Sequence, residues 1–211
     1  MMKTCLFFLI LLFFPFFSGA QQHAVTETGE EVILYEDGTW LYKSEQGSPH
    51  NEISVNPQKF EKSEDATFLL KSTKVDIGVW LNPKKWAFKK AVNNKDAEYE
   101  LQLKDEDLYG MIIAEKIEIP LETLRGIALD NARSVASDIY VAQQEYRNVN
   151  DQRVLFMQMN GTMQGVKITY YGYYFSNPGG TVQFLTYTAQ NLMNGYQKEC
   201  EELLNGLVVT E

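Results

Sequence analysis

Residues 165–189 read GVKITYYGYYFSNPGGTVQFLTYTA, and this stretch predicts two paired β-strands. Aromatic and β-branched residues, which favour strands, dominate 165–176 and 181–189. Between the two runs, Asn177-Pro178-Gly179-Gly180 has the residue types of a tight turn. The stretch is therefore predicted to fold as an antiparallel hairpin, around which the rest of a sheet can be placed.

The neighbouring sequence adds a strand before this hairpin and a helix after it. A strand over 152–159 precedes the hairpin across a turn at Asn160-Gly161. A helix over 190–205 follows, with Thr188 as its predicted N-cap and Gly206 as its predicted end. The apolar stripe of this helix consists of Leu192, Tyr196, Cys200 and Leu203.

The upstream half of the domain has the same alternating character. Strands are predicted near 75–81, over 97–103 and over 109–119, and a short segment carries Trp86 and Phe88. Pro120 then begins a helix, whose apolar stripe is Leu121, Leu124, Ala128, Ala132, Val135 and Ile139. The order of strands, helix, three strands and helix predicts an α+β fold, in which helices pack on an antiparallel sheet.

The first 67 residues are predicted to lie outside this domain. Residues 1–20 have the features of a signal peptide, because Lys3 precedes an apolar run that ends in small residues. We expect cleavage after Ala20 and a periplasmic or secreted protein without a transmembrane anchor. Residues 21–43 hold a β-hairpin around Asp37-Gly38, residues 44–67 form a polar linker, and residues 68–211 form the main domain.

Three local features of the main domain resemble the PsbP-like fold. They are the strand leading into Leu81-Asn82-Pro83-Lys84-Lys85-Trp86, the Glu115-bearing strand before the Pro120 helix, and the Tyr-rich strand followed by Phe184-Leu185-Thr186 and the closing helix. The resemblance covers about residues 68–207 and implies an α/β/α sandwich. Members of this fold mostly bind other proteins and share no common enzymatic activity, so the resemblance implies a binding role and assigns no site residues.

Composition excludes several kinds of function. The chain contains 19 basic and 28 acidic residues, for a net charge of −9, so we expect no binding to nucleic acid. The only two histidines, His23 and His50, lie before the main domain. A histidine-based catalytic triad or zinc site is therefore not expected there, and no metal or cofactor is predicted. The acidic turn Asp105-Glu106-Asp107 is interpreted as solvated, with calcium binding as the alternative.

Glu115 is the candidate for acid–base chemistry. Strict alternation places this carboxylate on the same side of its strand as Ile113 and Ile117. A buried carboxylate has a raised pKa and could act as a general acid or base. The alternative is a bulge or a position at the rim of the sheet, where the carboxylate meets a basic side chain.

Two further groups are candidates for binding. The first is a face of the Tyr-rich hairpin, predicted to be open to solvent unless a helix covers it, formed by Tyr171, Tyr173, Gln183 and Tyr187. The second is the basic stretch Lys84-Lys85-Trp86, in which the lysines could meet an acidic partner and Trp86 could be an anchor. The alternative for the second group is a buried Trp86 with solvated lysines.

These observations predict an exported, non-catalytic binding module whose partner is another protein of the cell envelope. The first alternative is a periplasmic protein that binds a small ligand on the Tyr171 face. The second is a hydrolase in which Glu115 is the general acid or base.

Overall fold

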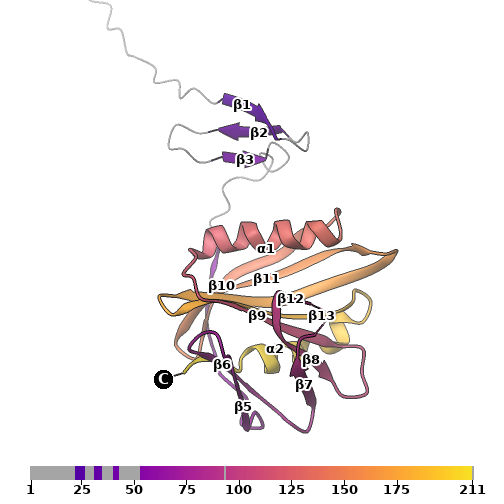
Figure 1. Ribbon diagram of the computed structural model, residues 1–211. Helices are drawn as coiled ribbons and strands as arrows, with labels where there is room; N and C mark the ends of the chain where they lie inside the picture. Colours follow the sequence, from indigo (N-terminus) through magenta and orange to yellow (C-terminus); the bar gives the residue numbers. More distant parts are fainter. Residues whose placement is uncertain (1–21, 27–30, 35–39, 43–52, 93, 211) are drawn as a thin grey trace, which may run out of the picture. The chain divides into compact units, whose positions relative to one another are not determined.

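The computed structural model describes residues 22–26, 31–34, 40–42, 53–92 and 94–210 (Figure 1). The chain divides into two compact units, residues 1–51 and residues 52–211. The predicted signal peptide lies outside the described residues, as does the Asp37-Gly38 turn.

The described part of the first unit is a small antiparallel sheet in the order β1-β2-β3. Strands β2 (Glu31–Leu34) and β3 (Trp40–Tyr42) pair antiparallel, as the predicted hairpin requires. Strand β1 (Gln22–Val25) pairs with the other side of β2 and was not predicted.

The second unit is an α+β domain built on an eight-stranded sheet in the order β4-β10-β11-β12-β13-β9-β8-β7. All neighbouring strands are antiparallel except β4 and β10, which are parallel, so the sheet is mixed. The strands are β4 (Val55–Phe60), β7 (Trp86–Lys90), β8 (Ala97–Leu103), β9 (Tyr109–Glu115), β10 (Tyr140–Val149), β11 (Gln152–Met163), β12 (Val166–Asn177) and β13 (Gly180–Ala189).

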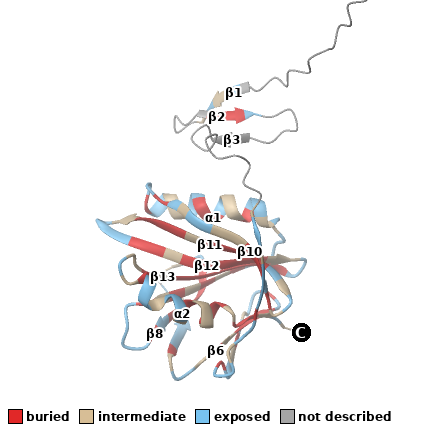
Figure 2. Cartoon of the chain, turned by 180° about the vertical axis from the view of Figure 1, so that it is seen from behind, coloured by how far each residue is buried: buried red, intermediate tan, exposed pale blue. Residues whose placement is uncertain are grey.

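Two cores lie on opposite faces of this sheet. Helix α1 (Leu121–Val135) packs on one face through Leu124, Ala128 and Leu129. The other face is covered by helix α2 (Met193–Leu204) and by a small sheet of β14 (Leu207–Val209), β6 (Ile77–Leu81) and β5 (Phe68–Lys71). Figure 2 shows the buried residues concentrated along the middle strands, where both cores meet the sheet.

The structure corrects four local predictions. The predicted linker contains β4, and the compact α/β unit begins at Glu52. Asn160 and Gly161 lie inside β11, opposite Thr169 and Ile168, and the turn follows later in the chain. Helix α1 ends at Val135, whose side chain is exposed, and the chain continues into the unpredicted strand β10. The N-cap residue of α2 is Leu192, while the Thr188 hydroxyl donates to the carbonyl of Asp107.

Gly206 is required where the chain leaves α2, because the backbone passes close to β6. The amide of Trp80 donates to the carbonyl of Gly206 at 2.8 Å. A Cβ at position 206 would lie 1.9 Å from the carbonyl oxygen of Trp80, which is backbone and cannot move aside like a side chain. The close approach of the two backbones thus explains why residue 206, just after α2, is a glycine.

We expect Gly206→Ala to lower the free energy of unfolding by about 2 kcal/mol, because the added methyl group forces α2 and β6 apart. Gly126→Ala in α1 is the matched control, since nothing lies within 4 Å of its Cβ position. The control should raise the free energy of unfolding by about 1 kcal/mol through helix propensity. Urea denaturation measures both changes, and equal effects of the two substitutions would refute the close-approach argument.

Candidate partner-binding surface

Tyr171 and Tyr173 do not form an open face, because α2 covers them. Both side chains are buried in the same core as Cys200 and Leu203 of α2. The Tyr171 hydroxyl donates to Glu201 at 2.8 Å. The prediction of a solvent-exposed tyrosine face at these two residues is therefore wrong.

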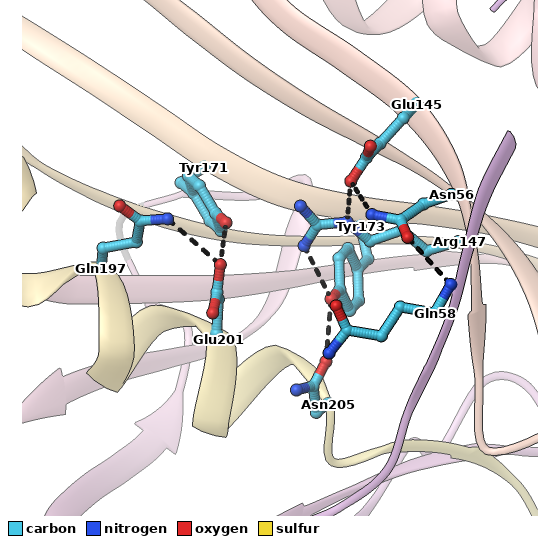
Figure 3. A network of polar contacts seen from close by, with 9 residues as sticks. All are labelled: Asn56, Gln58, Glu145, Arg147, Tyr171, Tyr173, Gln197, Glu201 and Asn205. Atoms are coloured by element: carbon cyan, nitrogen blue, oxygen red, sulfur yellow. Dashed lines mark hydrogen bonds and ion pairs between the residues drawn. The ribbon is translucent and has the colours of Figure 1, made fainter. Parts of the chain in front are cut away.

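A polar network around Arg147 closes the same interior (Figure 3). Arg147 extends from β10 and is only 8% exposed. Its Nε donates to Glu145 at 2.6 Å, and its Nη1 donates to the Tyr173 hydroxyl at 3.2 Å. The Tyr173 hydroxyl in turn donates to Asn205 at 2.8 Å, just after α2. The guanidinium carbon lies 3.9 Å from the ring centre of Phe156, so the charge is stacked as well as hydrogen-bonded.

This network is structural, and the sequence alone does not distinguish Arg147 as one of its members. A lone arginine in the polar stretch 140–149 resembles a solvated surface residue. Only the pairing of β10 into the sheet brings it beside Tyr173 of β12. Burial raises the pKa of Tyr173 to about 12, although the Arg147 charge acts in the opposite direction.

The raised pKa of Tyr173 predicts alkaline destabilisation. The unfolded phenol loses its proton near pH 10, whereas the folded one keeps it until about pH 12. Stability from this group is thus complete below pH 10 and is lost between about pH 10 and pH 12. Tyr173→Phe should weaken this pH dependence of the free energy of unfolding, measured by denaturant titration across that range.

At neutral pH, Tyr173→Phe should lower the free energy of unfolding by about 1–3 kcal/mol, because Arg147 and Asn205 lose a buried partner. Tyr196→Phe is the control, since that hydroxyl also donates to a side-chain oxygen, that of Glu106, but at the surface. We expect the control to unfold like the wild type. Equal destabilisation by both changes would show that the buried network has no special role.

Gln183 and Tyr187 lie on the opposite face from Tyr171. Their direct partners on β12 are Tyr174 and Tyr170, which share the α1 side of the sheet. Tyr187 is also paired with Tyr109 of β9, a residue that the sequence analysis did not single out. The rings of Tyr170, Tyr187 and Tyr109 form a tyrosine ladder across three strands, with ring centres 5.8 and 5.6 Å apart.

The tyrosine ladder is half-buried and is accompanied by an unsatisfied group. The Tyr174 hydroxyl is buried and has no hydrogen-bond partner among the described residues. Burial also raises the pKa of Tyr174, with Tyr170 as a second contribution. Gln183 is buried here, whereas Tyr187 is partly exposed.

Glu115 is exposed at the end of β9, so the hypothesis of a buried carboxylate is wrong. The residues of β9 that are buried in the core beneath α2 are Ile112 and Ala114. Glu115→Gln should therefore leave the melting temperature unchanged in a thermal scan, because solvent already satisfies the carboxylate. A large rise in melting temperature would mean that the charge was buried at a cost.

The lysine stretch lies at the opposite end of the sheet from β4, along the edge strand β7. Trp86 is buried, with 3% of its surface exposed, so it is a core residue and not an anchor. Lys85 bonds Glu202 at 3.0 Å, and Lys89 bonds Glu100 at 3.1 Å. Lys84 and Lys90 are exposed and have no ion-pair partner within the described part of the chain.

Two exposed phenylalanines accompany these lysines. Phe88 of β7 and Phe68 of β5 stack with ring centres 5.1 Å apart, although they belong to different sheets. They remain 38% and 40% exposed, respectively. We define the basic edge as Phe68, Lys84, Lys85, Phe88, Lys89 and Lys90, which the Phe68–Phe88 contact links across β5 and β7.

A polar depression of about 390 Å³ lies at the other edge, near β4 and the β10–β11 turn. Its lining residues are Lys59, Phe60, Glu61, Lys62, Asn148, Asn150 and Asp151. The Asn150 amide is already used, since it donates to the carbonyls of Asn205 and Leu207. Among the described residues, no group of three or more His, Cys, Asp or Glu side chains is placed to hold a metal.

The sequence matches no family model, and no curated protein matches it. The structure is similar to that of the cyanobacterial PsbP protein of Synechocystis sp. PCC 6803, with a TM-score of 0.52 and 13% identity. That match covers 70% of this chain and 94% of the other. The chain has the PsbP-like fold.

Two further solved structures with lower similarity were found. A protein of unknown function from Pseudomonas aeruginosa gives a TM-score of 0.43 at 9% identity, covering 67% of this chain and 95% of the other. LpqN of Mycobacterium tuberculosis, described as involved in cell envelope biogenesis, gives 0.39 at 8% identity, covering 76% and 93%. In the PsbP-like domain described here, no helix is long and apolar enough to cross a membrane.

Proposed function

We propose that this chain is an exported, non-catalytic binding module of the cell envelope, and that the basic edge contacts its protein partner. Export is supported by the signal-peptide features of residues 1–20. One face of the large sheet is covered by α2 and the small sheet, and the Arg147 network holds this covering in place. The surface available to a partner therefore consists of the residues that the covering leaves exposed.

The observation that carries the proposal is the exposed Phe68–Phe88 stack beside Lys84 and Lys90, for which the described residues offer no ion-pair partner. Lysines on an edge strand have a simpler explanation, because they prevent edge-to-edge aggregation. That explanation does not account for two phenylalanines left more than a third exposed at the same place. Aromatic side chains are enriched at the centre of protein interfaces, and polar groups form the rim.

The charge distribution favours an acidic partner. The whole chain carries a net charge of −9, and the basic edge is a local exception. Free lysines at Lys84 and Lys90 attract an acidic surface and accelerate its association, whereas the rest of the molecule repels it. Because these lysines are exposed, binding should weaken as salt is added.

The proposal predicts that reversing the charge of the edge abolishes partner capture. We expect the tagged mature protein to cross-link to an envelope protein in native extracts, and Lys84→Glu/Lys90→Glu to lose that cross-link. Lys85 is left unchanged, since reversing it would place two carboxylates together at Glu202. Quantitative mass spectrometry of the captured proteins provides the measurement.

Lys59→Glu/Lys167→Glu is the matched control, with the same change in net charge. Lys59 lies on β4 at the far edge, and its partner Asp151 is itself 84% exposed. Lys167 lies on β12 and is exposed. A partner that both double variants retain, or that both lose, would contradict the assignment of the basic edge.

A second candidate function is small-ligand binding at the tyrosine ladder. The unpartnered Tyr174 hydroxyl favours it, because a buried polar group without a partner is rare in folded proteins. A ligand that reached this hydroxyl would protect the fold, so a thermal-shift screen against polar aromatic compounds tests the idea. Tyr174→Phe should abolish any such shift without unfolding the domain.

A further inference from the structure

We propose that the partner binds as an extended acidic segment that adds a ninth strand to the large sheet, alongside β7. This inference rests on the proposed function, because it specifies how the basic edge is used. Strand addition supplies affinity through backbone hydrogen bonds and specificity through alternate side chains. It therefore requires free backbone groups on the outer side of β7 and side chains there that favour an acidic segment.

Within the described part of the chain, β7 pairs only with β8, so its outer side presents backbone groups for hydrogen bonding. Just outside the strand, the carbonyl of Lys85 accepts from Lys104 and the amide of Ala91 donates to Glu98, at 2.9 and 3.0 Å. Successive residues of a strand direct these groups to opposite sides. The residues at 85, 87, 89 and 91 therefore bond β8, and those at 86, 88 and 90 face outward.

Five outward groups remain for a new strand. The Trp86 amide is already used, since it donates to the carbonyl of Asn82 at 2.9 Å. The carbonyl of Trp86 and both backbone groups of Phe88 and Lys90 face outward. This row is long enough to pair a short extended segment in register.

The side chains of β7 specify the chemistry of that segment. Phe88 and Lys90 project from one face of the strand, and Ala87 and Lys89 project from the other. An apolar residue opposite Phe88 would extend the existing Phe68–Phe88 stack. Carboxylates opposite Lys90 and Lys89 would form cross-strand pairs of opposite charge, although Lys89 already has Glu100 as a partner.

The two edges of the sheet differ in a way that supports this assignment. The edge strand β4 contains Pro57, which has no amide hydrogen and so interrupts pairing. The edge strand β7 contains no proline. Its exposed residues are Ala87, Phe88, Lys89 and Lys90, so the edge is basic and aromatic but remains able to pair.

A fluorescein-labelled nine-residue peptide that repeats Glu-Glu-Val-Val is the probe, because it can place glutamates opposite Lys90 and Lys89 and a valine opposite Phe88. Fluorescence anisotropy measures its binding to the full mature chain. Lys90→Ala removes one charge and should weaken binding a few-fold. Lys90→Pro removes the same charge together with an outward amide, so it should weaken binding by about a further tenfold. A peptide with N-methyl groups on alternate residues keeps the charge but loses backbone donors. It should bind the wild-type protein no more tightly than the unmethylated peptide binds Lys90→Pro.

Folding controls follow from the same geometry. Lys90→Pro should melt within a few degrees of Lys90→Ala, because its amide makes no bond to β8. Lys89→Pro should melt clearly lower, because that amide belongs to the β7–β8 ladder. The reverse order of stabilities would overturn the assignment of the outward groups.

Strand addition would be overturned by equal binding to Lys90→Ala and Lys90→Pro, by undiminished binding of the N-methylated peptide, or by no binding up to about 1 mM peptide. The proposed function fails separately, when Lys84→Glu/Lys90→Glu still captures its envelope partner. A charge-dependent partner together with equal affinities of the two Lys90 variants would thus reject strand addition and retain the basic edge.

Discussion

The buried guanidinium of Arg147 joins segments of the domain that are far apart in sequence. It contacts Glu145 on its own strand, the Tyr173 hydroxyl on β12 and the ring of Phe60 on β4. Asn56 of β4 also donates to Glu145, at 3.0 Å. Because a desolvated charge is unfavourable unless it is fully paired, these partners must assemble together. The parallel strand β4, which no hairpin turn holds in place, is thereby fixed at the edge of the sheet.

The same requirement explains why Tyr173 is closed off beneath α2. Tyr173 connects Arg147 to Asn205, immediately beyond α2, so the helix is held against the sheet by polar bonds as well as by apolar packing. An opening on this side would expose a network whose members stabilise one another. Binding is therefore expected at surfaces that the two cores leave free, namely the edge at β7 and the tyrosine ladder.

The sequence predicted the elements that depend on local signals. Alternation and a tight turn are encoded within a few residues, which is why β8, β12, β13 and the Asn177–Gly180 turn were found. Strand β10 and the pairing of β4 were missed, because their polar sequences gain stability only from contacts distant in the chain. The PsbP-like fold was confirmed because topology depends on the order of elements more than on their ends.

The candidate residues were predicted less well, because a site depends on register and coverage. Alternation correctly separated Tyr170 from Tyr171, but it did not show that a helix packs on each side of the sheet. Gln183 and Tyr187 were grouped with Tyr171 because a shift of one residue between β12 and β13 exchanges the two faces. Only the pairing of Tyr174 with Gln183 assigns them. Lys84 and Lys85 were singled out by charge alone, which can be read from the sequence without knowledge of the fold.

The lysines of β7 should act in opposite ways on two possible partners of this edge, a second copy of the strand and an acidic segment. When two copies of β7 approach, the positive charges of Lys89 and Lys90 on one strand repel those on the other. An acidic segment meets the same side chains with the opposite sign and completes the Phe68–Phe88 stack. Discrimination between partners is a difference of affinities. Here the lysines lower the affinity for a second copy of β7 and raise the affinity for an acidic segment. Pro57 removes one amide from β4 for any partner, whereas the lysines of β7 disfavour a second copy and favour an acidic strand.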